Sequence, residues 1–329
     1  MATEIGRLGV WAALDGLSAS QAAAFAQRVE AWGYSALWTP EAVGRDPFSF
    51  IGFLAGQTES LVLATGIANI YARDPMTMKS IHKTCAELAP GRFVLGIGVS
   101  HEHLVSRVRG HDYTKPLSTM RAYLDALDSA LYMGAEPGEE APIVLAALRD
   151  KMLGLAASRT RGAHPYLVPP EHTARAREVM GPDAWLCPEQ MGMLESDAEG
   201  ARKVGRANLK VYIGLPNYRN NLKQFGFTDA DFEDGGSDRL VDAMIAWGDA
   251  DTIRARVQAH WDAGADHVCI PAFRRDGNPN PDAALLEALA PNGGAQDAAT
   301  KFLGLGGRER GTRRRPAGRN PQDHGAKAR

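Results

Sequence analysis

Apolar and polar positions alternate in a regular rhythm along most of the chain. Short apolar runs, of the length typical of β-strands, are separated by longer stretches in which apolar residues repeat with helical spacing. We expect eight strands, at residues 8–14, 36–39, 61–67, 93–98, 143–146, 163–168, 185–188 and 267–272. This pattern predicts an α/β protein whose strands are parallel and joined by helical crossovers.

The stretches between the strands carry helix signals at their ends. Ser18 precedes an alanine-rich run that stops at Gly33, which combines an N-cap with a C-terminal glycine. Asp74 and Pro75 open a second helix, and a third begins at Asp249. Eight strands favour closure into a (β/α)8 TIM barrel over an open doubly wound sheet.

Two insertions and a tail depart from this rhythm. Residues 110–134 hold a loop and a long helix, and residues 206–247 form a polar excursion, so both are expected at the C-terminal rim where barrel enzymes carry their sites. We expect residues 1–291 to form the barrel. Residues 292–329 are rich in Arg and Gly and predict a disordered tail, which is either inert, a contact for RNA or acidic partners, or a diverged terminus.

Composition narrows the class of protein. The chain has 329 residues, is 44% hydrophobic and carries a formal net charge of −2, so it shows no bias toward nucleic acid or membrane surfaces. Cys85, Cys187 and Cys269 are far apart and are expected to be buried and unpaired, with no metal-binding spacing. Without a secretory signal or a long apolar segment, the sequence predicts a cytoplasmic protein.

Candidate chemistry lies where strands end. The third strand ends at Gly66, which lets backbone approach a ligand closely, and the fourth leads through a small-residue loop to His101, a side chain that titrates near neutrality. The second strand ends with Trp38 and Glu41. A dinucleotide fingerprint is excluded because position 101 is His rather than Gly.

The sixth and seventh strands end in similar groups. Two prolines after the sixth strand begin a helix whose first amides, with Thr173, are either a phosphate site or a simple helix start. Glu189 adds a carboxylate after the seventh strand.

Several of these segments together resemble the luciferase-like monooxygenase superfamily, and within it the branch of coenzyme F420-dependent oxidoreductases. The strings are GYSALWTPE at 33–41, TGIANIYARDP at 65–75 and LGIGVSH at 95–101. Further matches lie at 145–148, 162–166, 216–218, 236–242 and 263–268, so that the resemblance covers about residues 5 to 275.

The resemblance implies a barrel, usually a homodimer, that binds coenzyme F420 or, alternatively, FMN at its C-terminal rim. It implies a non-prolyl cis peptide at Gly66–Ile67 pressing on the back of the ring, with the loop after the fourth strand beside it. The implied cofactor-binding residues are Trp38, Gly66, Ile67, Asn69, Gly98, Val99, Ser100, His164 and Tyr166.

This chain departs from the family in its acid/base residues. Many relatives carry an Asp-His pair after strand two, where this chain has Pro40 and Glu41, and some carry a carboxylic acid where it has His101. We therefore expect His101 to act as acid or base, with Glu41 orienting it or the substrate.

Three functions remain open. The leading one is hydride transfer by a deazaflavin to or from a small organic substrate. The alternatives are an FMN-dependent monooxygenase and a non-catalytic flavin-binding barrel.

Overall fold

The strands form one parallel sheet in the computed structural model, which describes residues 3–292. Its strands are β1 (Leu8–Trp11), β2 (Ala36–Thr39), β3 (Val62–Thr65), β4 (Ala68–Asn69), β5 (Phe93–Gly98), β6 (Ile143–Leu145), β7 (Gly162–Ala163), β8 (Trp185–Leu186), β9 (Met191–Leu194), β10 (Ile245–Gly248) and β11 (Val268–Phe273). The order is β10-β9-β11-β1-β2-β3-β5-β6-β7-β8, with β4 paired to β5.

The sheet closes on itself between β8 and β11. The amide of Asp266 donates to the Leu186 carbonyl at 3.0 Å, and that of Cys269 donates to the Pro188 carbonyl at 3.1 Å. A parallel bridge joins Glu189 to Cys269. The predicted (β/α)8 TIM barrel is therefore confirmed, with three additional short strands: β4 follows β3, β9 pairs with β11, and β10 pairs with β9.

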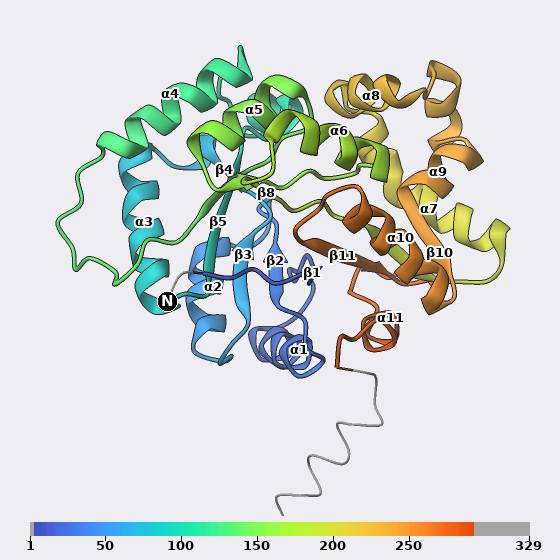
Figure 1. The fold of residues 1–329 in the computed structure, drawn as a ribbon, viewed down its shortest axis with the longest axis horizontal. Helices are drawn as coiled ribbons and strands as arrows, with labels where there is room; N and C mark the ends of the chain where they lie inside the picture. The colour runs from blue at the N-terminus through green and yellow to red at the C-terminus, as the bar shows by residue number, and fades with distance from the viewer. Residues whose placement is uncertain (1–2, 293–329) are drawn as a thin grey trace, which may run out of the picture. The chain divides into compact units, whose positions relative to one another are not determined.

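Helices surround this sheet, as Figure 1 shows. They are α1 (Ala19–Ala31), α2 (Pro47–Ala55), α3 (Pro75–Leu88), α4 (Pro116–Ser129), α5 (Asp150–Arg159), α6 (Pro170–Met180), α7 (Ala198–Ile213), α8 (Pro216–Leu222), α9 (Asp238–Met244), α10 (Ala250–Asp262) and α11 (Ala283–Ala288). Ser18 caps α1 in a capping box, and Asp74 and Asp249 cap α3 and α10, so the three predicted helix starts are confirmed.

Several predicted strands are longer than the observed ones. The first ends at Trp11 rather than at residue 14, and the third divides into β3 and β4. The sixth was expected over residues 163–168 but ends at Ala163. Leu167 there has a φ of 57°, a left-handed conformation that no strand accommodates.

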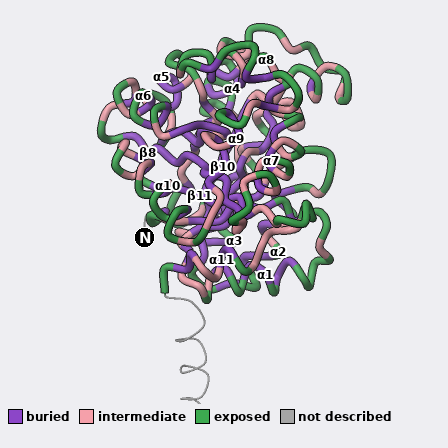
Figure 2. The backbone as a smooth tube through the Cα atoms, turned by 90° about the vertical axis from the view of Figure 1, so that its right-hand side faces the viewer, coloured by how far each residue is buried: buried purple, intermediate pink, exposed green. Residues whose placement is uncertain are grey.

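The second insertion is mostly helical. Residues 206–247 contain the end of α7, then α8 and α9, and finish in β10. A hydrophobic cluster with members such as Leu209, Leu240 and Met244 packs these helices together, separately from the main core. Figure 2 shows buried backbone concentrated at the strands, with exposed residues on the outer helices. The insertion is therefore a packed helical layer rather than a polar loop.

Other expectations have mixed outcomes. All three cysteines are buried and unpaired, as predicted. In the described part of the chain no helix is both long and apolar enough to cross a membrane. The predicted tail at 292–329 lies outside the described residues, apart from Asn292.

Candidate functional site

A backbone bulge follows β3 at the C-terminal end of the barrel. The peptide bond between Gly66 and Ile67 is cis, as expected. The chain then pairs with β5, and Asn69 lies opposite Gly98 in the register. A Cβ added at Gly98 would lie 2.7 Å from Ile67 Cδ1 and 2.9 Å from Ala146 Cβ. Glycine at position 98 therefore lets the bulge and the loop after β5 lie in direct contact.

Aromatic side chains pack beneath the bulge. Trp38 is fully buried, stacks on His164 with ring centroids 4.4 Å apart and donates its Nε1 proton to His267 Nε2 at 3.0 Å. Trp11 donates from Nε1 to the Gly66 carbonyl at 2.9 Å. Trp38 has no exposed surface and packs on His164 and His267 inside the barrel, so the structure gives no support to its expected role as a cofactor contact.

Glu41 and Arg73 form an ion pair, referred to below as the clamp, that holds the backbone of the bulge at Asn69. The Glu41 carboxylate lies 2.8 Å from Arg73 Nη1 and accepts the Asn69 amide proton at 2.8 Å, while its side chain is only 6% exposed. Arg109 Nη2 lies 3.9 Å away. No hydrogen bond between Glu41 and His101 occurs in the described part of the chain. The geometry thus assigns Glu41 to holding the backbone and gives no support to its orienting His101.

The loop after β5 carries the residues that remain partly exposed. Ser100 has a φ of 55°, and its carbonyl accepts a proton from Tyr113 Oη at 3.1 Å. His101 packs on Tyr218 with ring centroids 5.4 Å apart. Burial lowers the pKa of His101, while a hydrogen bond to the Asn217 side chain partly opposes that shift. The imidazole is therefore predominantly neutral at pH 7.

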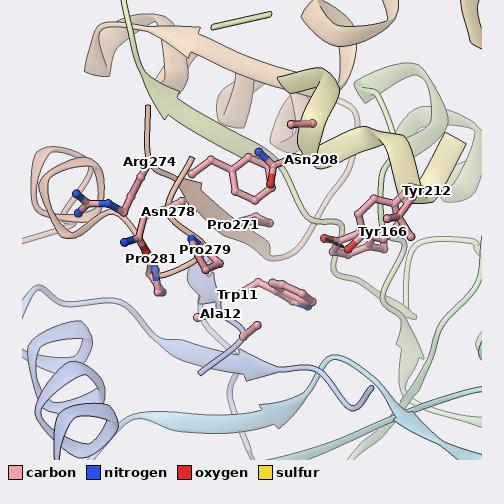
Figure 3. A pocket seen from close by; sticks show the side chains of 15 residues that line it. Trp11, Ala12, Tyr166, Asn208, Tyr212, Pro271, Arg274, Asn278, Pro279 and Pro281 are labelled. Atoms are coloured by element: carbon pink, nitrogen blue, oxygen red, sulfur yellow. Dashed lines mark hydrogen bonds between the residues drawn. The ribbon is translucent and has the colours of Figure 1, made fainter. Parts of the chain in front are cut away.

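A pocket of about 410 Å³ opens beside the bulge, at the ends of β1 and β11. Figure 3 shows Trp11, Tyr166 and Tyr212 on one side of it and Arg274 and Asn278 on the other. Of the predicted cofactor residues only Tyr166 lines this pocket. Trp11, which also bonds the Gly66 carbonyl, connects pocket and bulge. An aromatic residue at the end of the first strand was the available signal for Trp11, and it was missed because that strand was expected to continue to residue 14.

Aromatic contacts also run from the pocket to His101. Tyr166 packs against Trp11 at 5.1 Å between centroids, and its hydroxyl lies 3.2 Å from that of Tyr212. Tyr212 meets Tyr218 edge to face at 5.7 Å, and Tyr218 contacts His101. The second insertion supplies Tyr212 and Tyr218, so its helices build part of the site wall. Sequence periodicity alone does not show which helix face points inward.

Several buried polar atoms lie at the C-terminal ends of strands without a hydrogen-bond partner. They are Thr39 Oγ1, Asn69 Nδ2 and His164 Nε2, and none has a partner among the described residues. Thr39 and Asn69 are the last residues of β2 and β4, and His164 follows β7 by one residue. Buried polar atoms are normally paired, so an unpaired set at the C-terminal rim indicates a ligand site.

Of the two alternatives for the start of α6, the side-chain contacts favour a simple helix start over a phosphate site. Thr173 is completely buried, and its hydroxyl lies 2.8 Å from His260 Nδ1. His172 is also buried, with Nε2 at 2.6 Å from the Leu148 carbonyl. These side chains join α6 to its neighbours. In the described residues, no cluster of His, Cys, Asp and Glu could hold a metal ion.

Comparison with known proteins identifies the family. The fold is a (β/α)8 barrel with a candidate ligand site at its C-terminal rim. The model of the luciferase-like monooxygenase family matches residues 6–181, more than half of the chain, and the chain belongs to this family.

One relative and two solved structures illustrate the range of the family. A Mycobacterium tuberculosis protein whose name assigns it to the coenzyme F420-dependent oxidoreductases is 28% identical over 170 residues, which are 52% of this chain but only 46% of that protein. An F420-dependent secondary alcohol dehydrogenase, solved with an F420-acetone adduct, has a TM-score of 0.68 at 13% identity and covers 87% of this chain and 97% of its own. The oxygenating constituent of 3,6-diketocamphane monooxygenase from Pseudomonas putida, solved with FMN, has a TM-score of 0.66 at 15% identity and covers 87% and 97%. At these identities the two structures establish the fold alone.

Proposed function

We propose that this chain is an oxidoreductase dependent on the deazaflavin coenzyme F420, which passes a hydride between the ring and a small organic substrate. The observation that carries the proposal is the set of unpaired buried polar atoms at the strand ends, next to a glycine-lined bulge. The pyrimidine edge of a deazaflavin or flavin presents carbonyl oxygens and an N–H group. The Asn69 amide donor and the His164 lone pair match such an edge in chemical type.

The residues present fit such a ring. Gly66 and Ile67 would support one face, and Gly98, Val99 and Ser100 would border its edge. Tyr166 would lie at the boundary between the ring and the 410 Å³ pocket. Bound there, the cofactor supplies a carbon that accepts or donates a hydride, and the protein fixes the ring and excludes water.

His101 would handle the proton. When an alcohol is oxidised, its hydroxyl proton must leave as the hydride departs from carbon. Because burial lowers the pKa of His101, its imidazole is free to accept that proton at neutral pH. Asn217, which hydrogen-bonds His101, would hold the imidazole of His101 in place.

The test is titration of the purified protein with F420 and, separately, with FMN, followed by ring fluorescence. We expect F420 to bind more tightly. Tight binding of FMN alone would replace the proposal with a flavin-dependent monooxygenase; the diketocamphane enzyme, which has a similar fold, was solved with FMN. Binding of neither cofactor would contradict both.

A paired substitution locates the binding site. Gly98→Ala places a Cβ 2.7 Å from Ile67 Cδ1, so the bulge must shift, and we expect the affinity for F420 to fall at least about tenfold, or 1.4 kcal/mol. Gly154→Ala, in α5 with open space around it, is the matched control and should leave affinity unchanged. Thermal unfolding followed by circular dichroism checks that both variants fold. If the Gly98→Ala and Gly154→Ala proteins bind F420 with equal affinity, the deazaflavin ring binds elsewhere.

The expected homodimer stays a prediction, which light scattering on the purified protein would test.

A further inference from the structure

Glu189 is a buried carboxyl group that the proposed hydride transfer does not use. It follows β8 at the C-terminal end of the barrel and is only 1% exposed. Its Oε1 accepts the Leu167 amide proton at 2.6 Å, whereas Oε2 has no partner among the described residues. One backbone hydrogen bond is too little to hold a charged carboxylate out of water.

Two hydrogen bonds place this group directly beside the pocket wall. The Glu189 amide donates to the Pro165 carbonyl at 3.1 Å, and the Leu167 amide donates to the Glu189 side chain. The two bonds bracket Tyr166, and Leu167, which follows it, has a left-handed φ of 57°. Tyr166 carries the hydroxyl that lies 3.2 Å from that of Tyr212, and both residues line the pocket.

No positive charge compensates Glu189 in the described part of the chain. The titratable side chains that interact with its charge are Tyr166 after β7, Tyr212 on α7, Tyr218 on α8 and Cys269 on β11. Burial raises the pKa of each of these four groups, so all are neutral at pH 7. Burial likewise raises the pKa of Glu189 to about 8, and the Leu167 hydrogen bond opposes this only in part.

We propose that Glu189 is a positioning residue of the pocket: its buried carboxyl group, bonded only to the Leu167 amide, forms an uncharged wall behind the Tyr166 and Tyr212 hydroxyl pair. The consequence for substrate, which rests on the proposed function, is a preference for a neutral alcohol or carbonyl compound whose oxygen bonds to this hydroxyl pair. A carbonyl oxygen gains negative charge when its carbon accepts a hydride. A neutral wall with hydroxyl donors stabilises that charge, and an ionised Glu189 opposes it.

The decisive variant is Glu189→Gln. Glutamine keeps the shape of the side chain and an oxygen for the Leu167 amide, but it stays neutral at every pH. Glu178→Gln, an exposed position on α6, is the matched control. Circular dichroism and thermal unfolding establish that both variants fold.

The first readout needs neither cofactor nor substrate. The infrared band of a protonated carboxylic acid should be present in the ligand-free protein at pH 7, disappear as the pH rises through about 8, and be missing from Glu189→Gln. The Glu178→Gln protein should keep the band. Absence of the band from the parent protein at pH 7 would overturn the proposal.

The second readout is the pH profile of turnover with F420 and a neutral alcohol or ketone. We expect the parent and Glu178→Gln to lose activity above about pH 8 and Glu189→Gln to match the parent at pH 7 while keeping its activity at higher pH. An unchanged alkaline loss in Glu189→Gln, or a large loss at pH 7, would overturn the positioning role. If the parent binds no cofactor, the proposed function fails, and the infrared band still decides the charge of Glu189.

Discussion

At the scale of single residues, the structure separates groups that sequence reasoning had treated alike. His101 and Glu41 both follow barrel strands and were expected to act together. Glu41 is 6% exposed at its side chain and bound to Arg73, whereas His101 is half-buried beside the tyrosines that lead to the pocket. Only His101 therefore keeps a free role in proton transfer.

His101→Gln tests that role. Glutamine can still hydrogen-bond Asn217 but cannot accept a proton, so we expect turnover to fall by about 100-fold or more, with F420 affinity unchanged. His103→Gln, at the exposed first residue of the short π-helix His103–Val108, is the control and should behave as the parent. Turnover and cofactor affinity are measured separately, since a loss confined to affinity would assign His101 to binding instead. Unchanged turnover would remove His101 from the mechanism.

At the scale of elements, the bulge after β3 depends on a clamp from β2. Arg73 bonds Glu41 and is also paired with Asp46, while Glu41 accepts the Asn69 amide proton. The clamp fixes the backbone that faces the loop after β5, because Asn69 lies opposite Gly98. If the cofactor binds at this bulge as proposed, its affinity and the stability of the fold are coupled at this point.

Glu41→Ala should destabilise the fold by roughly 2–3 kcal/mol, because it leaves the Asn69 amide unbonded and Arg73 with a single partner. Urea unfolding measures the loss. Asp128→Ala, which removes an exposed partner of Arg159, is the control and should change stability little. If Glu41→Ala also shifted the pH profile of turnover while His101→Gln did not, Glu41 rather than His101 would carry the acid/base role.

The elements also show what the sequence could predict. All eight barrel strands were located, since each is a short buried apolar run, and the helix starts at Ser18, Asp74 and Asp249 were readable from their capping side chains. β9 and β10 were missed: both are short, and β10 follows α9 without a turn signal. The left-handed turn at Leu167 was missed because a leucine rarely adopts that conformation.

The candidate site was only partly predictable, because local motifs identify its loops but not the contacts between distant segments. Local motifs identify loops, so the cis peptide at Gly66–Ile67 was expected correctly from the family resemblance. Contacts between distant segments, such as Tyr212 with Tyr166, depend on how the insertion packs over the barrel. The sequence also does not show which candidate side chains are buried. Trp38 and Thr173 have functional groups that could contact a ligand, but both side chains are buried in the interior.

At the scale of the whole molecule, the described core contains histidines held in the neutral form. His164 and His267 lie inside the barrel, and His172 and His260 lie on α6 and α10. Burial lowers the pKa of His164, His172 and His267 to about 4 and that of His260 to about 3. The unfolded chain protonates these groups near pH 6.5, so it binds more protons than the folded chain between about pH 6.5 and 4.

The fold should therefore lose stability as the pH falls through that window. Above pH 6.5 both states hold neutral imidazoles and the stabilisation is complete; below about pH 4 it has been lost. Glu189 acts in the opposite direction, because its raised pKa makes the folded chain bind more protons between about pH 4.5 and 8, but it is one group against these four and the buried His82, whose pKa burial also lowers. Urea unfolding at pH 7, 6, 5 and 4 should show a falling free energy of unfolding.

His172→Gln isolates one of these contributions. The glutamine amide can donate to the Leu148 carbonyl as His172 Nε2 does, but it does not titrate, so the variant should lose less stability between pH 7 and 4 than the parent. His103→Gln, at an exposed position, should show the parental dependence. Since each unit of pKa depression corresponds to about 1.4 kcal/mol, one buried histidine suffices for a measurable difference. A free energy of unfolding that stays constant from pH 7 to 4 in the parent would contradict neutral burial of these residues.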